Sequence, residues 1–182
     1  DLFSTFKEVS SYSKLDSLGR FEIKVPLINS TEVFMDWKHT FINTVLEPGE
    51  TYYLLYDFKA GHTIFMGKKC RLQNELLANP FPMINTEYPG KYENKVPAQE
   101  MMQILEARYK EAEGNLRKLI DESESISKCY QDYTARYLLC NYASSILQGA
   151  YRVKDHIFPQ EYVSQVEKIW KEIPQPYTLF RD

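Results

Sequence analysis

The feature that most constrains this chain is a tight turn, Glu47-Pro48-Gly49-Glu50, which leads into an aromatic and aliphatic run ending at Phe58. Pro48 fixes φ at the first central position of the turn, and Gly49 accepts the positive φ that a type II turn needs at the second. The Tyr, Leu and Phe residues of the run favour the pleated, half-buried surface of a β-strand. Because both faces of this strand are mainly apolar, we expect it to lie inside a sheet that is covered on each side.

Four other short segments in the N-terminal part have the composition or the alternation of β-strands, namely residues 21–25, 32–37, 40–46 and 62–66. In the first of them, Phe21, Ile23 and Val25 alternate with charged residues, which predicts one buried and one solvated face. A turn at residues 38–39 is expected to join the second segment to the third. Short strands at this spacing predict an antiparallel sheet, arranged as a β-sandwich or a partly open barrel.

After residue 67 the apolar side chains follow the spacing of helices. A first helix is predicted over residues 69–79, and it ends before Pro80 because the residue before a proline avoids the helical region. Residues 80–96 are rich in proline and are predicted to be a linker. Three amphipathic helices are then predicted, from Pro97 to residue 120, from a cap at Ser125 or Ser127 to residue 154, and from Pro159 to residue 173.

These patterns predict an α+β fold, with an N-terminal antiparallel β-sandwich or partly open barrel followed by a small helical bundle. The expected division is a β-sandwich-like domain with its exit helix over residues 1–79, a linker over residues 80–96, and a helical region over residues 97–182. The formal net charge of -3 predicts no strong attraction to nucleic acid or to an anionic membrane. No stretch of about 18 apolar residues is present, so no transmembrane helix is predicted.

The three cysteines, Cys70, Cys129 and Cys140, form neither a CxxC motif nor a metal-ligand spacing. Their odd number leaves at least one thiol without a partner in the chain. Cys129 and Cys140 are expected on one straight helix, where their Cα atoms would lie about 16 Å apart, which is too far for a disulfide. We expect the cysteines to be buried thiols that pack as small hydrophobes.

The sequence contains no motif or spacing that is typical of a catalytic or metal-binding site. The histidines His39, His62 and His156 are scattered without metal-binding spacing, and no phosphate-binding or nucleophile motif is present. The glutamates between residues 100 and 113 alternate with basic residues and are interpreted as a solvated helix face. We therefore predict no catalytic residue, no cofactor-binding residue, no metal ligand and no cofactor.

Two aromatic clusters have a functional alternative to packing. The stripe Tyr130, Tyr133 and Tyr137 is interpreted as helix core, although it could line a ligand groove. Trp37 and His39, at the end of a predicted hairpin, are interpreted as packing residues, although they could stack on a sugar.

Five short motifs follow one another along the N-terminal part. They are Gly19-Arg20-Phe21-Glu22-Ile23-Lys24-Val25-Pro26-Leu27, Leu46-Glu47-Pro48-Gly49-Glu50-Thr51, Asp57-Phe58, Phe65-Met66-Gly67 and Gln73-Asn74-Glu75-Leu76. In this order they resemble the N-terminal region of secreted Bacteroidetes thiol-disulfide oxidoreductases of the TlpA/thioredoxin-like type. In that family a β-sandwich is followed by a helical segment and then by a thioredoxin domain with a CxxC motif. The resemblance covers residues 19–79 by motif and residues 97–173 by architecture only.

The resemblance implies an extracytoplasmic parent protein, in the periplasm or cell envelope, with a lipid anchor before this chain. The family's redox cysteines have no counterpart here, so any catalytic thioredoxin-like domain is expected beyond Asp182. We therefore expect a non-catalytic accessory region that positions the redox domain or its client, with that C-terminal domain or a protein client as its partner. The alternative is a stand-alone extracytoplasmic binding module for a glycan or a peptide.

Overall fold

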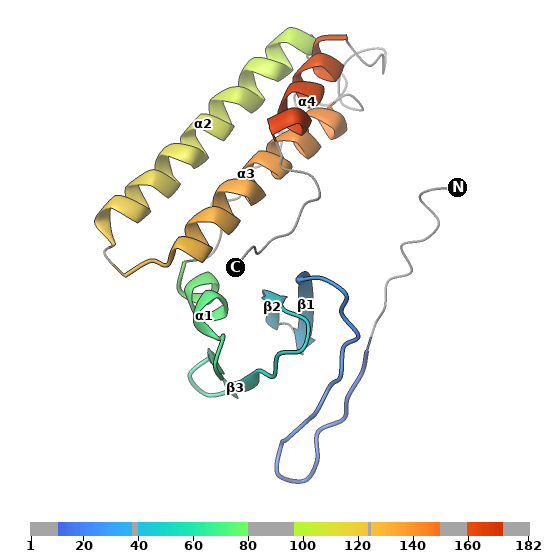
Figure 1. Cartoon of the computed structure of the whole chain (residues 1–182), viewed down its shortest axis with the longest axis vertical. Helices are drawn as coiled ribbons and strands as arrows, with labels where there is room; N and C mark the ends of the chain where they lie inside the picture. The colour runs from blue at the N-terminus through green and yellow to red at the C-terminus, as the bar shows by residue number, and fades with distance from the viewer. Residues whose placement is uncertain (1–10, 38–39, 80–96, 124, 150–159, 173–182) are drawn as a thin grey trace.

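The computed structural model of the chain describes residues 11–37, 40–79, 97–123, 125–149 and 160–172 (Figure 1). The strands in these residues are β1 (Thr31–Trp37), β2 (Thr40–Leu46), β3 (Tyr53–Asp57) and β4 (His62–Met66). The helices are α1 (Arg71–Ala78), α2 (Ala98–Glu122), α3 (Lys128–Gly149) and α4 (Gln160–Glu172). Helices α2, α3 and α4 lie together, and α1 lies between them and the strands (Figure 1).

The strands form two antiparallel hairpins and not the predicted sandwich or barrel. The first hairpin pairs β1 with β2, from Thr31 opposite Leu46 to Trp37 opposite Thr40, and the second pairs β3 with β4, from Tyr53 opposite Met66 to Asp57 opposite His62. Among the described strands, no hydrogen-bonded ladder joins one hairpin to the other. The α+β prediction is confirmed, but the β-sandwich or partly open barrel is wrong, because two sheets of two strands are too small to build either.

The predicted strand at residues 21–25 is also wrong. This segment belongs to no sheet, and Ile23 and Val25 are 40% and 37% exposed. Alternation along a segment determines which way its side chains point, but a strand forms only where another backbone completes its ladder. The turn before this segment is formed as predicted, because Gly19 has a φ of 75° and the Asp16 carboxylate accepts the Arg20 N–H at 2.8 Å.

The turn before β3 also has its predicted backbone. Gly49 has a φ of 75°, and the Glu50 N–H donates to the Glu47 carbonyl at 3.4 Å. A positive φ strains residues that carry a Cβ, so glycine is required at this position. The turn therefore directs the chain into β3 as the sequence indicates.

The four predicted helices are confirmed within the described ranges and supply most of the core. Tyr109 of α2 stacks on Tyr142 of α3 with ring centroids 4.6 Å apart. Ser127 is the cap of α3, because its hydroxyl accepts the Tyr130 N–H at 3.1 Å. The central buried side chains of this cluster are Leu72, Leu76, Met101, Leu105, Leu116, Tyr130, Tyr133, Leu138, Ile146 and Tyr162. The predicted linker at residues 80–96 lies outside the described residues.

Helix α1 is bonded to both hairpins through two neighbouring amide side chains. Gln73 is fully buried, and its Nε2 donates to the Val45 carbonyl of β2 at 2.6 Å. Asn74 contacts β4, because its Oδ1 accepts the Phe65 N–H at 2.9 Å and its Nδ2 donates to the Phe65 carbonyl at 2.8 Å. Each hairpin is therefore fixed to α1 by a side chain that bonds strand backbone.

The next residue of α1 bonds the helical part of the chain. The Glu75 carboxylate accepts the Ser127 N–H at 2.8 Å and the Ser127 hydroxyl, at the point where α3 begins. Arg71 donates to Glu75 at 3.0 Å and to the Ser125 carbonyl at 2.7 Å. We refer to Gln73, Asn74 and Glu75 as the α1 junction, because these consecutive side chains connect both hairpins to the helices.

Candidate functional site

One side of the β3–β4 hairpin carries large apolar side chains that are open to solvent. Tyr53, Leu55, Ile64 and Met66 are 65%, 56%, 48% and 44% exposed. The strand register places Tyr53 opposite Met66 and Leu55 opposite Ile64, so these four side chains are neighbours on one face. We refer to them as the hairpin face.

The opposite side of the same hairpin faces the body of the protein. Phe65 is buried there, and Leu54 and Tyr56 are partly buried. The prediction that this strand is covered on both sides is therefore wrong for the hairpin face. The sequence held one signal of this difference, since the polar pair Asp57 and His62 shares the face of Tyr53 and Leu55.

The two edges of the hairpin also differ. At the β4 edge, the Asn74 side chain bonds both backbone groups of Phe65. Phe65 and Leu54 are opposite one another, so this must be a non-hydrogen-bonded pair, and the N–H and C=O of Leu54 point away from β4. No described strand pairs with β3 on that side. The β4 edge is thus blocked by a side chain, whereas along the other edge of the hairpin no strand of the described residues is paired with β3.

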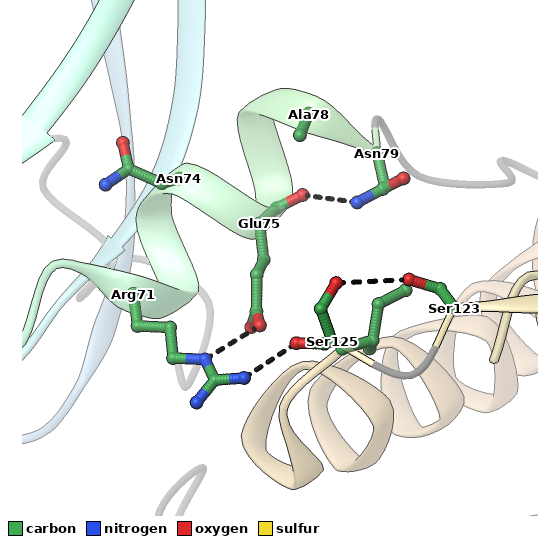
Figure 2. A pocket seen from close by; sticks show the side chains of 8 residues that line it. Arg71, Asn74, Glu75, Ala78, Asn79, Ser123 and Ser125 are labelled. Carbon is green, nitrogen blue, oxygen red and sulfur yellow. Dashed lines mark hydrogen bonds and ion pairs between the residues drawn. The ribbon is translucent and has the colours of Figure 1, made fainter.

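A shallow pocket of about 350 Å³ lies between α1 and the α2–α3 connection. Its lining residues are Arg71, Asn74, Glu75, Ala78, Asn79, Ser123, Ser125 and Ile126. Figure 2 shows that polar groups in it bond their neighbours: Arg71 donates to the Glu75 carboxylate and to the Ser125 carbonyl, and the Asn79 side-chain amide donates to the Glu75 backbone carbonyl. Because these groups are already engaged, we interpret the pocket as part of the structural contact between α1 and α3.

The cysteines do not form a reactive centre. Cys129 and Cys140 are exposed and Cys70 is half-buried, so the prediction of buried thiols is wrong for the two cysteines of α3. Partial burial of the sulfur, and then the carboxylates of Glu47 and Glu75, raise the pKa of Cys129 to about 11. Partial burial also raises the pKa of Cys140. Thiols with raised pKa values are protonated at neutral pH and react slowly as nucleophiles.

The tyrosine stripe lies where the packing interpretation placed it. Tyr130 and Tyr133 are buried in the core, and Tyr137 is partly buried with its ring centroid 6.3 Å from that of Tyr133. The hydroxyl of Tyr133 donates to the Glu32 carboxylate at 2.6 Å, which connects α3 to β1. The stripe is therefore core, as predicted.

The remaining candidates give no site. The interpretation of the α2 glutamates as a solvated face is confirmed by two ion pairs of i,i+4 spacing, from Glu106 to Lys110 and from Glu113 to Arg117. His62 is exposed on the hairpin. The other two histidines and the side chain of Trp37 lie outside what the structure describes.

Comparisons with known proteins gave no match, either among family models, among curated proteins or among solved structures. Within the described ranges, no cluster of His, Cys, Asp and Glu side chains is arranged to hold a metal ion. In the same ranges, no helix combines the length and the hydropathy needed to cross a membrane. The hairpin face is therefore the feature from which a function is argued.

Proposed function

We propose that this chain is a non-catalytic accessory region of an extracytoplasmic thiol-disulfide oxidoreductase. In this proposal the hairpin face docks the redox domain, or the protein client on which that domain acts. The observation that carries the proposal is the exposed apolar patch of Tyr53, Leu55, Ile64 and Met66. Contiguous apolar side chains in contact with water are typical of a surface that binds another protein.

The chemistry of the thiols agrees with an accessory role. A redox-active cysteine needs a lowered pKa, whereas the pKa of Cys129 is raised to about 11 and that of Cys140 is also raised. A thiol-disulfide exchange centre would therefore have to come from the partner. The motif residues that suggest the family serve the fold itself, since a Cβ at Gly67 would lie 3.0 Å from the Thr51 carbonyl oxygen.

The test compares the excised chain with the full-length product of its gene in a thiol-disulfide exchange assay on a protein substrate and on a small disulfide. We expect the excised chain to be inactive and the full-length protein to be active on both substrates. Leu55→Lys in the full-length protein should lower kcat/KM for the protein substrate and leave the small disulfide unaffected. The control is Gln103→Lys, which adds the same single positive charge at an exposed site on α2.

Two results would contradict this proposal. One is a full-length protein that has no exchange activity or no CxxC domain. The other is a Leu55→Lys variant that behaves like Gln103→Lys on the protein substrate, because the hairpin face would then play no part in docking.

A stand-alone module for a glycan or a peptide is the second candidate. The observation that favours it is the exposure of two aromatic rings close together in the chain, Tyr53 and Phe58. Exposed aromatic rings stack on the apolar faces of sugars and peptides. Saturable binding of an oligosaccharide to the excised chain, abolished by Tyr53→Ala, would favour this function over the first.

A further inference from the structure

One member of the hairpin face, Met66, presents an oxidisable sulfur atom at the surface of the protein. Met66 is 44% exposed, whereas Met101 is fully buried, and Met35 and Met102 are partly buried. The fifth methionine of the chain, Met83, lies outside the described residues. Among the described methionines, Met66 is therefore the one that a dissolved oxidant reaches most readily.

The fold determines that the Met66 side chain points outward. Phe65, the residue before it in β4, is buried, and the Asn74 side chain bonds its backbone N–H and carbonyl. Because successive side chains of a strand point to opposite faces, Met66 lies on the outer one. The next residue, Gly67, fits closely against the chain just before β3, where an added Cβ would lie 3.0 Å from the Thr51 carbonyl oxygen. The thioether is thus held at the surface by both of its neighbours in the chain.

We propose that Met66 is a reversible oxidation site, and that its oxidation to the sulfoxide switches the hairpin face from apolar to polar. The oxidant is a hydroperoxide. The sulfur lone pair attacks the terminal peroxide oxygen, an S–O bond forms, the O–O bond breaks, and the proton of the transferred oxygen leaves with the other oxygen as water or an alcohol. The sulfur loses two electrons and the peroxide gains them. In the reverse step a methionine sulfoxide reductase uses a dithiol, which becomes a disulfide while its two protons leave with the oxygen as water.

The two thiols of α3 compete poorly for a hydroperoxide at neutral pH, because the thiolate is the form that hydroperoxides oxidise. Partial burial of the sulfur raises the pKa of Cys129 to about 11 and also raises the pKa of Cys140, so both thiols stay protonated. A thioether has no proton to lose. The oxidation of Met66 therefore depends on access to its sulfur and not on its ionisation.

Oxidation changes the polarity of the hairpin face more than its shape. The sulfoxide adds a hydrogen-bond acceptor to a side chain that was apolar. The strand register places Met66 opposite Tyr53, so this acceptor enters the apolar surface itself and not its margin. A protein that buries the face then has to supply a donor for the new oxygen or leave it unpaired, which weakens binding. This step rests on the proposed function, because it takes the docked protein as the occupant of the hairpin face.

The first experiment tests the site on this chain alone. The folded chain is treated with limiting hydrogen peroxide, and mass spectrometry of its peptides follows the oxygen gained by each methionine over time. We expect Met66 to be oxidised several-fold faster than Met35 and Met102, and Met101 to be the slowest. In urea, where all side chains are exposed, the four rates should become equal. A folded chain in which Met66 reacts no faster than Met101 overturns the proposal, and so does a sulfoxide at Met66 that methionine sulfoxide reductases do not reduce.

The second experiment measures the effect of oxidation on docking in the full-length protein. Each sample is oxidised, treated briefly with dithiothreitol to restore its thiols, and compared with its own untreated sample in the exchange assay. Oxidation should lower kcat/KM for the protein substrate about tenfold, as one unpaired polar group in an interface does, and leave the small disulfide unaffected. In Met66→Leu, which has an apolar side chain without sulfur, the oxidised and untreated samples should agree.

The outcomes distinguish this proposal from the proposed function. If oxidation lowers kcat/KM for the protein substrate equally in Met66→Leu and in the unsubstituted protein, another residue carries the effect and the switch is refuted. The switch is also refuted if the oxidised protein keeps its activity on the protein substrate while Leu55→Lys loses it, although docking by the hairpin face then stands. If Leu55→Lys behaves like Gln103→Lys, docking fails, and the oxidation rates of the first experiment still decide whether Met66 is the oxidation site.

Discussion

Replacing Glu75 by alanine tests whether the α1 junction holds the hairpins on the helices. The side chain of Glu75 is 13% exposed, and it accepts two hydrogen bonds from Ser127 and one from Arg71. Hydrogen bonds to a charged group contribute about 1.5–3 kcal/mol, and a partner left without its bond adds a desolvation cost. The Arg71 contact adds little, because its side chain is 67% exposed to screening by water.

We therefore expect Glu75→Ala to lower the free energy of unfolding by about 3 kcal/mol, measured by urea denaturation. For a chain of this length, that corresponds to a fall in Tm of roughly 6–12 °C. Glu75→Gln keeps one acceptor oxygen and should lose about half as much.

The matched control for this series is Glu113→Ala. Glu113 also pairs with an arginine four residues away, but both groups are exposed. Exposed helix pairs of this spacing contribute about 0.5 kcal/mol or less. If Glu75→Ala destabilised the protein no more than Glu113→Ala does, the junction would carry no appreciable energy, and the reasoning about α1 would be refuted.

Three further predictions test other parts of the structure, two by substitution and one by chemical modification. Gly114→Ala in α2 should stabilise the protein by about 1 kcal/mol in urea denaturation, because nothing lies within 4 Å of the added Cβ and alanine is the better helix former; a loss of stability would mean that the position is constrained. The alkylation rate of Cys129, followed by mass spectrometry, should still rise with pH above 9, because its pKa is raised to about 11; a rate that levels off just above the pKa of an ordinary thiol, about 8.5, would contradict the partial burial of its sulfur. Asn74→Ala should expose the backbone of Phe65 and cause association that light scattering detects, while unchanged scattering would show that the β4 edge needs no block.

The local elements of this protein could be predicted from its sequence, and their assembly could not. The helices have long apolar stripes, and the turn at Gly49 has a residue that accepts positive φ, so both follow from neighbours in the chain. The prediction of a β-sandwich is wrong because strand pairing depends on backbone segments that are distant in the sequence. The alternation of apolar and polar residues does not specify which segments pair. The segment with Ile23 and Val25 has as regular a pattern as the real strands, yet it forms no ladder.

The candidate site was missed for the same reason. Tyr53 and Leu55 were expected in a covered sheet because apolar residues occupy both sides of the strand. Which side is covered depends on α1, whose Asn74 bonds β4 from a position nine residues after Phe65. The motif Gln73-Asn74-Glu75-Leu76 is apparent in the sequence, but the hydrogen bonds of the Asn74 side chain to Phe65 depend on how α1 packs against β4.

The α1 junction also explains how an apolar face can persist on so small a sheet. A lone hairpin would bury its apolar residues by collapsing onto the nearest surface, since two strands have little stability of their own. Here Asn74 fixes β4 through its backbone edge, and buried Phe65 anchors the side that faces the body. The hairpin is therefore held in place without using Tyr53, Leu55, Ile64 or Met66, and these four side chains remain available to another protein.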